Sequence, residues 1–291
     1  MIIDFEQHRS HLRGVAYRML GSLAEADDAV QEAWLRLDRA DPSDVANPRG
    51  WLTTVVARVC LDMLRTRTSR REEPMDPRDD RPATTDVEQE RILTDSVGLA
   101  LLVVLDKLEP AERLAFVLHD LSGMPFDDIA TIVSRTPDAT RQLASRARRR
   151  VQGSPPPETE LASQRHIVET FIAALRRGDV EGLIAVLDPD VIGRAVDNTG
   201  NVREVRGART WASGAVAFAQ LASSMAPAPA LIDGSVGIVM APKGRLVRVL
   251  RFTFKDGRIA SAEVIVDRAR LDALDIAAIE LPTDAPAGRV E

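Results

Sequence analysis

Cysteine and aromatic residues are scarce in this sequence. The 291-residue chain has one cysteine, Cys60, which lies in a strongly apolar segment. A single cysteine excludes an intramolecular disulfide framework and a cysteine-based zinc site, and it fits a reducing cytosol. Aromatic residues make up only 4% of the chain. That scarcity favours helical packing over a large aromatic-rich sheet.

Long hydrophobic runs are missing as well. No stretch approaches about 18 uninterrupted apolar residues, so the sequence predicts no membrane span. The first residues, 1–5, have no basic group followed by an apolar stretch, and we therefore expect no signal peptide. Hydrophobic residues nevertheless make up 45% of the chain, enough for two or three packed domains. We expect a cytoplasmic protein that does not bind membranes.

Negative charge prevails overall, but its distribution is uneven. The formal net charge is −6. Residues 24–44 contain two arginines and seven acidic residues, whereas residues 49–71 contain six arginines and one aspartate. Segments that alternate in sign are compatible with separate surfaces for a protein and a nucleic acid. Ordinary solvated helix faces would give the same pattern, so charge alone leaves the partners open.

Residues 5–72 are predicted to be helical. Between residues 23 and 37, apolar side chains recur three and four positions apart and predict a buried stripe of Ala26, Val30, Ala33, Trp34 and Leu37. The opposite face of this helix carries Asp28, Gln31, Glu32 and Leu35. A leucine among carboxylates is typical of a partner-binding face, although single exposed leucines are also common.

A basic helix is predicted next, with Asn47 as its cap, Pro48 at its first position and its end near Arg71. Its buried stripe is predicted to comprise Leu52, Val55, Val56, Val59 and Met63. Its other face comprises Trp51, Thr54, Arg58, Leu61 and Arg65. Aromatic and basic side chains on one face suit melted DNA, because bases stack on rings and arginines hold the backbone. The alternative is a core tryptophan beside a basic helix end that the helix dipole favours.

A helix-turn-helix is predicted within residues 125–151. After helices at 97–108 and 110–121, a short helix at 125–133 is followed by a turn and a helix that begins at Thr136-Pro137. The second helix presents Thr140, Arg141, Gln142, Ser145, Arg146, Arg148 and Arg149. Side chains near its start suit base edges, and the later arginines suit phosphates. An ordinary helical hairpin with a basic face remains the alternative.

The last part of the chain has a mixed pattern. Polar, proline-rich segments precede each of the two last domains, at about 73–90 and at 153–157. Helices are predicted at 161–177, 179–187 and 207–222. Two strands, 246–254 and 258–266, are predicted to form a hairpin through Lys255-Asp256-Gly257. We therefore expect a compact α+β domain over residues 161–280.

Four segments together resemble one protein family. Residues 25–35, EADDAVQEAWL, resemble the polymerase-binding helix of extracytoplasmic-function sigma factors, and 51–65, beginning WLTTVVAR, resembles their −10 helix. The segments AFVLHD at 115–120 and RQLASRAR at 141–148 resemble their −35-binding domain. The chain is thereby identified as a member of the subgroup that carries a C-terminal SnoaL-like domain.

The resemblance implies a multidomain fold with two all-α sigma domains, the second bearing the helix-turn-helix, followed by an α+β, cone-shaped SnoaL-like domain. The implied boundaries are 1–72 for sigma domain 2, 73–91 for a linker, 92–152 for sigma domain 4, 153–160 for a second linker and 161–285 for the SnoaL-like domain. Because both linkers are polar and proline-rich, we expect the third domain to control the sigma domains, which stay folded without it.

The resemblance also implies partners and contact residues. Core RNA polymerase, through its β′ clamp and β subunits, would be bound by Asp28, Gln31, Glu32 and Leu35. The −10 element would be bound by Asn47, Trp51, Thr54, Arg58, Arg65 and Arg67. The −35 element would be bound by Arg135, Thr136, Thr140, Arg141, Ser145, Arg146, Arg148 and Arg149.

Regulation is expected in the C-terminal domain, where the subgroup's Asp-Gly-Gly-Gly-Lys motif is reduced to Asp197 and Gly200. Purely structural control is the leading hypothesis, and a small-molecule ligand of this domain is an alternative. Enzymatic activity is not expected and no cofactor is implied, although the carboxylates Asp190, Asp197, Glu204 and Glu263 leave acid–base chemistry open. Two alternative functions are a stand-alone helix-turn-helix transcriptional regulator and a SnoaL-type enzyme.

Overall fold

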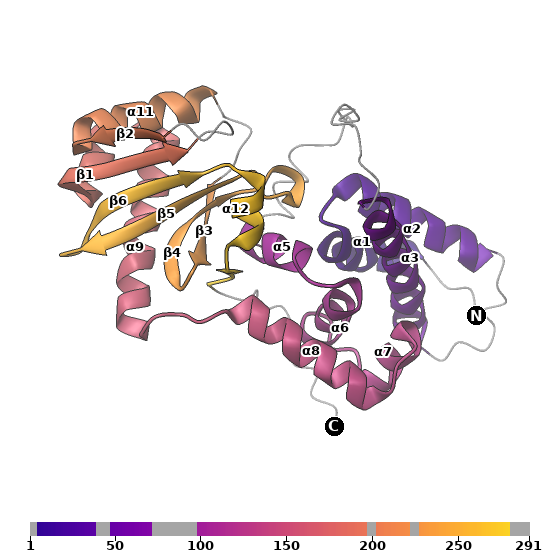
Figure 1. The fold of residues 1–291 in the computed structure, drawn as a ribbon. Helices are drawn as coiled ribbons and strands as arrows, with labels where there is room; N and C mark the ends of the chain where they lie inside the picture. Colours follow the sequence, from indigo (N-terminus) through magenta and orange to yellow (C-terminus); the bar gives the residue numbers. More distant parts are fainter. Residues whose placement is uncertain (1–4, 39–46, 72–97, 197–201, 222–226, 280–291) are drawn as a thin grey trace. The chain divides into compact units, whose positions relative to one another are not determined.

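The computed structural model describes residues 5–38, 47–71, 98–196, 202–221 and 227–279 (Figure 1). Its contacts divide the chain into two compact units. Helical segments from residue 5 to Arg149 make up the first unit, apart from 99–104. The second unit comprises Leu99–Val104 and the chain from Arg150 onward.

Three helices begin the first unit: α1 (Glu6–Leu20), α2 (Leu23–Asp38) and α3 (Pro48–Arg71). All three contact one another, around fully buried side chains that include Leu12, Tyr17 and Leu52. Gly21 ends α1 with a φ of +75°, and its N–H donates to the carbonyl of Tyr17 at 2.8 Å. A left-handed C-cap of this kind favours glycine.

Four helices follow: α5 (Leu99–Asp106), α6 (Pro110–Asp120), α7 (Phe126–Val133) and α8 (Pro137–Gln152). Helix α6 contacts α1 and α3, and α7 contacts α3, so α6 and α7 belong to the same unit as the first three helices. Arg113 of α6 is only 2% exposed. Its Nε donates to the carbonyl of Arg18 in α1 at 3.2 Å.

Helix α5 is buried on every side. Each residue from Leu99 to Leu105 is at most 9% exposed, as expected of a helix that is apolar all round. Leu99–Val104 groups with the second unit rather than with the other helices of sigma domain 4. This assignment differs from the predicted sigma domain 4, which begins at residue 92 and includes α5.

The end of α8 also belongs to the second unit. The carbonyl of Val151 accepts from the N–H of Ala278 at 2.9 Å. Gly153 lies so close to Ala277 that a Cβ on this glycine would be 2.4 Å from the alanine Cβ. Since the next helix begins at Glu158, the non-helical segment spans 153–157, which is shorter than the predicted linker of 153–160.

The described residues of the second unit form a seven-stranded sheet in the order β2-β1-β6-β5-β4-β3-β7, and among these strands only the β1–β6 pair is parallel. Its strands are β1 (Leu187–Val196), β2 (Val202–Arg206), β3 (Pro227–Ile232), β4 (Ser235–Met240), β5 (Arg248–Lys255), β6 (Arg258–Ile265) and β7 (Ile276–Ala277). Its helices are α9 (Glu158–Arg177), α10 (Val180–Val186), α11 (Ala208–Leu221) and α12 (Arg268–Ala273). The predicted α+β architecture and the β5–β6 hairpin are confirmed.

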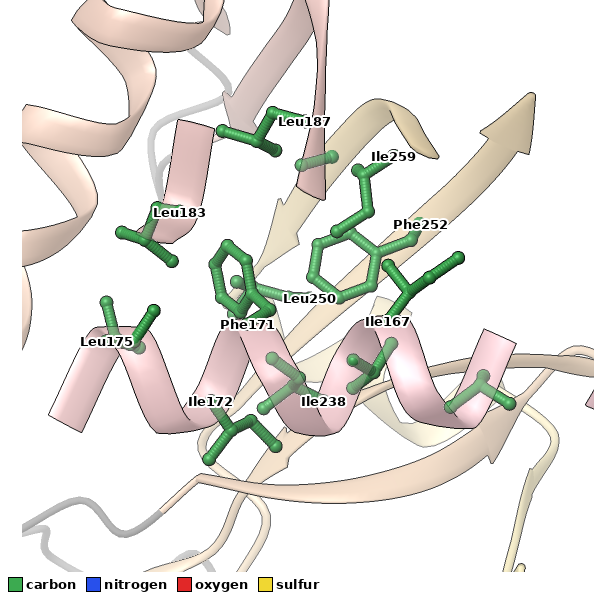
Figure 2. Packing of buried hydrophobic residues seen from close by; sticks show 14 of the residues in the cluster. Ile167, Phe171, Ile172, Leu175, Leu183, Leu187, Ile238, Leu250, Phe252 and Ile259 are labelled. Atoms are coloured by element: carbon green, nitrogen blue, oxygen red, sulfur yellow. The ribbon is translucent and has the colours of Figure 1, made fainter. Parts of the chain in front are cut away.

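The core of this unit lies between the sheet and helix α9 (Figure 2). Phe171 of α9 packs edge-on against Phe252 of β5, with ring centroids 5.5 Å apart. Buried Gln164 fixes the helix along the sheet, because its Oε1 accepts from the N–H of Val236 at 2.9 Å. A Cβ at Gly193 of β1 would lie 2.0 Å from the Trp211 ring, so only glycine lets α11 pack this closely.

No helix in the described ranges combines the length and apolar character that crossing a lipid bilayer requires.

Candidate polymerase and promoter interfaces

The outer face of α2 carries the residues predicted to bind polymerase. Asp28, Gln31 and Leu35 are exposed, and Leu35 keeps 43% of its surface accessible. Other acids of the helix are engaged, since Asp27 pairs with Arg13 at 2.7 Å and Glu32 with Arg36 at 2.9 Å. Asp28 has no ion pair with any described residue. The face is an exposed leucine flanked by an unpaired carboxylate and an amide.

The predicted buried stripe of this helix is wrong at Trp34. The sequence analysis placed it in the core, but it is 45% exposed. Phe5 covers it from one side, with ring centroids 4.9 Å apart in an edge-on arrangement. Side by side, Trp34 and Leu35 make the exposed face of α2 more apolar than the sequence predicted.

The predicted −10 face of α3 is basic and accessible. Arg58 and Arg65 are exposed, and neither has an ion pair or hydrogen bond with a described residue. Trp51 and Thr54 are half-buried beside them. At the start of the helix, the Asn47 side chain accepts from the N–H of Gly50 at 3.0 Å, which confirms the predicted cap and occupies its carbonyl oxygen.

Two side chains of α3 depart from expectation. Leu61 was assigned to the exposed face but is buried. Arg67, predicted to contact DNA, forms an ion pair with Glu25 of α2 and donates to the carbonyl of Leu20 at 3.2 Å. Its guanidinium therefore joins α1, α2 and α3 in this structure.

A histidine–threonine pair supports the start of α3. The Nε2 of His11 lies 3.2 Å from the Oγ1 of Thr53, and an Arg49 guanidinium nitrogen lies 3.2 Å from its Nδ1. Burial, followed by the charge of Arg49, lowers the pKa of His11 to about 4. A neutral ring that accepts from Arg49 at Nδ1 carries its proton on Nε2, where it donates to Thr53. This contact joins residues 42 positions apart, so no local sequence pattern predicts it.

Helices α7 and α8 form the predicted helix-turn-helix. Ser134 makes the turn with a φ of +56°, and the Oγ1 of Thr136 accepts from the N–H of Ala139 at 3.2 Å, as its predicted capping role requires. Arg135, Ser145 and Arg149 are exposed. Neither of these two arginines has an ion pair with a described residue.

Thr140 is not available to DNA. Its side chain is fully buried, at 0% exposure, and its Oγ1 donates to the carbonyl of Thr136 at 2.9 Å. The prediction that it contacts DNA is wrong, because this position of α8 faces the interior of the unit.

Two other predicted DNA contacts attach α8 to α6. Arg146 pairs with Glu112 at 2.8 Å, and the Nε of Arg148 donates to Asp120 at 2.8 Å. Glu112 is only 5% exposed. These arginines therefore stabilise the domain as well as being predicted to face DNA.

Arg141 is held by an aromatic side chain that the sequence analysis did not single out. Its guanidinium lies 5.7 Å from the centroid of the Phe126 ring, and His119 stacks on this ring at 3.7 Å. Asp138, one turn earlier, forms an ion pair with Arg141. The position of Phe126 at the start of α7, the first helix of the helix-turn-helix, is the sequence signal that points to this role.

The C-terminal carboxylates are mostly tied to arginines. Hydrogen bonds from Arg194 and Arg206 lower the pKa of Glu204. Burial alone would raise the pKa of Glu263. Hydrogen bonds from Arg270 and Arg251 outweigh burial and lower this pKa. A general acid at neutral pH needs the opposite shift.

Other predicted features of the C-terminal domain give no further site. Asp190 is exposed, and the predicted regulatory residues Asp197 and Gly200 lie outside the described residues. So does the predicted linker 73–91. Among described residues, no three histidine, cysteine or acidic side chains are grouped as a metal site would require.

Comparison with known proteins agrees with the two helical segments. The family described as Sigma-70 region 2 matches residues 5–70, and Sigma-70, region 4, matches residues 98–151. These ranges cover α1–α3 and α5–α8 respectively, apart from the last residue of α3 and of α8.

Two curated relatives match over nearly their whole length. The "Probable ECF RNA polymerase sigma factor SigI" of Mycobacterium tuberculosis is 36% identical over 273 residues, which cover 92% of this chain and 93% of the relative. The "ECF RNA polymerase sigma factor SigJ" of the same species is 35% identical, with 89% of each chain covered. A crystal structure of SigJ is 32% identical and covers 92% of this chain and 96% of its own, with a TM-score of 0.47.

Similarity of this extent includes the α+β domain as well as both helical regions. The chain belongs to the extracytoplasmic-function RNA polymerase sigma factors, in the subgroup with a C-terminal SnoaL-like domain.

Proposed function

We propose that this sigma factor binds core RNA polymerase through the outer face of α2, with the β′ clamp as the docking site and further contacts to the β subunit. Leu35 supplies an apolar contact, and Asp28 and Gln31 at its edge supply polar ones. Support comes from the combination of an exposed leucine with a carboxylate that has no partner among described residues. Such a face gains most from a complementary basic partner.

The −10 element is assigned to α3, with Trp51 and Thr54 beside the exposed Arg58 and Arg65. The −35 element is assigned to α8 and the turn before it, through Arg135, Arg141, Ser145 and Arg149. The observation that carries both assignments is that four exposed arginines of α3, of α8 and of the turn before α8 have no carboxylate partner among described residues: Arg58, Arg65, Arg135 and Arg149. Unneutralised guanidinium groups are available to phosphates and bases.

A double substitution tests the polymerase face. Asp28→Ala with Glu32→Ala should leave the free energy of unfolding within about 0.5 kcal/mol of the parent, because both positions lie at the surface. Co-purification with core polymerase and promoter-dependent run-off transcription should drop sharply. A matched control is Glu181→Ala with Asp272→Ala, which removes the same charge from exposed ion pairs of the second unit. Polymerase binding that is equal in both variants would overturn the assignment.

For the C-terminal domain we infer a structural mode of regulation, with a small-molecule ligand as the second candidate. The second unit includes Leu99–Val104 of α5 and the end of α8, so it shares two segments with the −35-binding region. Removing residues 161–291 should therefore do more than release a tethered regulator. The buried apolar surface of α5 would lose its cover, and exposing apolar area is unfavourable.

Truncation after residue 160 tests this inference. In place of the expectation that the sigma domains stay folded, we infer that Leu99–Val104 loses protection, because these residues group with the second unit. We expect faster amide hydrogen exchange over 99–105 and several-fold lower run-off transcription than with the full chain at equal concentration. Unchanged exchange and equal transcription at several concentrations would contradict it.

A further inference from the structure

Almost all half-buried arginines in the described part of the second unit form an ion pair with a carboxylate. Among the described residues 158–279, four arginines are half-buried. Three of them form ion pairs: Arg165 with Glu169, Arg251 with Glu263, and Arg270 with Glu263. Arg248 is the exception, because no described residue forms an ion pair or hydrogen bond with it. A partly desolvated cation without a counter-charge is costly, so its presence calls for an explanation.

Arg248 lies on the apolar side of the sheet. Side chains alternate along a strand, so it shares a face with Leu250 and Phe252 of β5, which belong to the core cluster. Figure 2 shows these two side chains on the side of the sheet that α9 covers. In the neighbouring strand β4, buried Met240 is paired in register with Arg248. The Arg248 side chain therefore lies on the same side of the sheet as the apolar core, at the start of β5.

One face of the guanidinium is covered by an aromatic ring. The central carbon of the Arg248 guanidinium, Cζ, lies 3.9 Å from the centroid of the Phe218 ring on α11. Desolvation lowers the pKa of Arg248 from its usual value, although an arginine stays cationic at neutral pH. Stacking leaves the in-plane N–H groups of the guanidinium free to donate to another molecule.

A second cation lies at the same end of the sheet. Arg176, in the last turn of α9, donates to the carbonyl of Pro227 at 3.2 Å and has no carboxylate partner among described residues. Pro227 is paired in register with Met240, which is paired with Arg248. The backbone positions of Pro227 and Arg248 are thus two strands apart, or about 10 Å. This end of β3, β4 and β5 is consequently electropositive.

We propose that Arg248, stacked on Phe218, is the anchor of a binding site for a small anionic molecule that carries a carboxylate or phosphate group. The planar guanidinium fork matches two oxygen atoms of such a group. Partial desolvation strengthens the attraction relative to a fully exposed arginine. The site lies in the α+β domain, and its existence does not depend on the polymerase or promoter contacts proposed above.

Anion binding can be measured on the full-length chain without polymerase or DNA. Inorganic phosphate and benzoate are the two probes, each titrated at constant ionic strength against sodium chloride. The Arg248 Nε–H resonance in a ¹⁵N-arginine-labelled sample, assigned by its absence from Arg248→Lys, reports on the site itself. At ten times the dissociation constant, the unfolding equilibrium constant should also fall about elevenfold.

Three variants separate the outcomes. Arg245→Gln, an exposed neighbour with the same loss of charge, should behave like the parent. Arg248→Gln should lose the stabilisation by the probes, and Arg248→Lys should lose most of it because lysine keeps the charge without the fork. A response to one probe alone identifies carboxylate or phosphate as the ligand class. The proposal is overturned if neither probe shifts the Arg248 resonance, or if both Arg248 variants are stabilised as much as the parent.

Discussion

The helical first unit and the sheet-containing second unit use arginine in different ways. On the predicted DNA-facing surfaces of α3 and α8, exposed arginines such as Arg58 and Arg149 have no ion pair in the described chain. In the second unit, Arg194 and Arg206 share Glu204, and other arginines share Glu263. Unpaired guanidinium groups are available to an external polyanion, whereas paired ones are already neutralised within the fold. We therefore expect pairing, rather than the number of arginines, to decide which guanidinium groups of α3 and α8 bind DNA. Arg176 and Arg248 of the second unit also lack a carboxylate partner among described residues, and they belong to the anion site proposed above.

Loss of unpaired arginines from α3 should give the largest effect. Arg58→Ala with Arg65→Ala should lower promoter-dependent transcription at least about tenfold, since each contact to DNA is worth roughly 1–3 kcal/mol. The free energy of unfolding should change by less than about 0.5 kcal/mol for each exposed position. Run-off transcription and urea denaturation measure the two quantities. Normal transcription from the double variant would break the assignment of this face.

Arg146 and Arg149, one turn apart on α8, sharpen the comparison within a single helix. Arg146→Ala should reduce the free energy of unfolding by about 1 kcal/mol, because it removes a charged donor from nearly buried Glu112, with some loss to solvent screening. Arg149→Ala should change it by less than about 0.5 kcal/mol. Urea denaturation of both variants tests this difference, and equal stabilities would show that the Arg146 pair contributes nothing.

Phe126 tests whether an aromatic side chain positions a DNA-contacting arginine. Phe126→Leu keeps an apolar residue at the start of α7 but removes the ring under Arg141, a contact worth about 0.5–1 kcal/mol at an exposed site. Binding of the holoenzyme to promoter DNA should weaken a few-fold, and adding Arg141→Ala should cost less than it does in the parent. Fully additive effects in this double-mutant cycle would count against positioning.

A further comparison concerns His11 and pH. Its folded pKa of about 4 lies below the ordinary value of 6.5 for histidine, so the unfolded chain binds the proton more readily between these values. The stability that the neutral ring contributes is complete above about pH 6.5 and is lost as the pH falls toward 4. The stability difference between the parent and His11→Gln should therefore shrink over this window. His8→Gln serves as the control, and a difference that is independent of pH would refute the account of His11.

Local features of the fold were predictable because they depend on neighbouring residues. Asn47 and Thr136 were recognised as helix caps from their positions before prolines. The hairpin between β5 and β6 was predicted from Asp256-Gly257, and both residues have positive φ angles, as a tight hairpin turn requires. Each of these signals lies within a few residues of the structure that it specifies.

Features that depend on distant parts of the chain were not predictable. Helical periodicity placed Trp34 in the core and Leu61 and Thr140 at the surface, whereas the structure has the opposite. A helix wheel shows which residues share a face, but the elements packed around the helix decide which faces are covered. The pairing of Arg146 with Glu112, 34 positions away, depends on the packing of α8 against α6. Exposed arginines with and without partners look the same in the sequence.

The salt dependence of promoter binding by the holoenzyme tests the central comparison most directly. Arg135→Ala with Arg149→Ala removes two unpaired arginines, and Arg194→Ala with Arg206→Ala removes two that are paired with Glu204. If the unpaired arginines contact phosphates, the slope of log binding constant against log salt concentration should become shallower by about 1.8 in the first variant. It should stay at the parental value in the second. Equal slopes in the two variants, or a change confined to the second, would contradict the account.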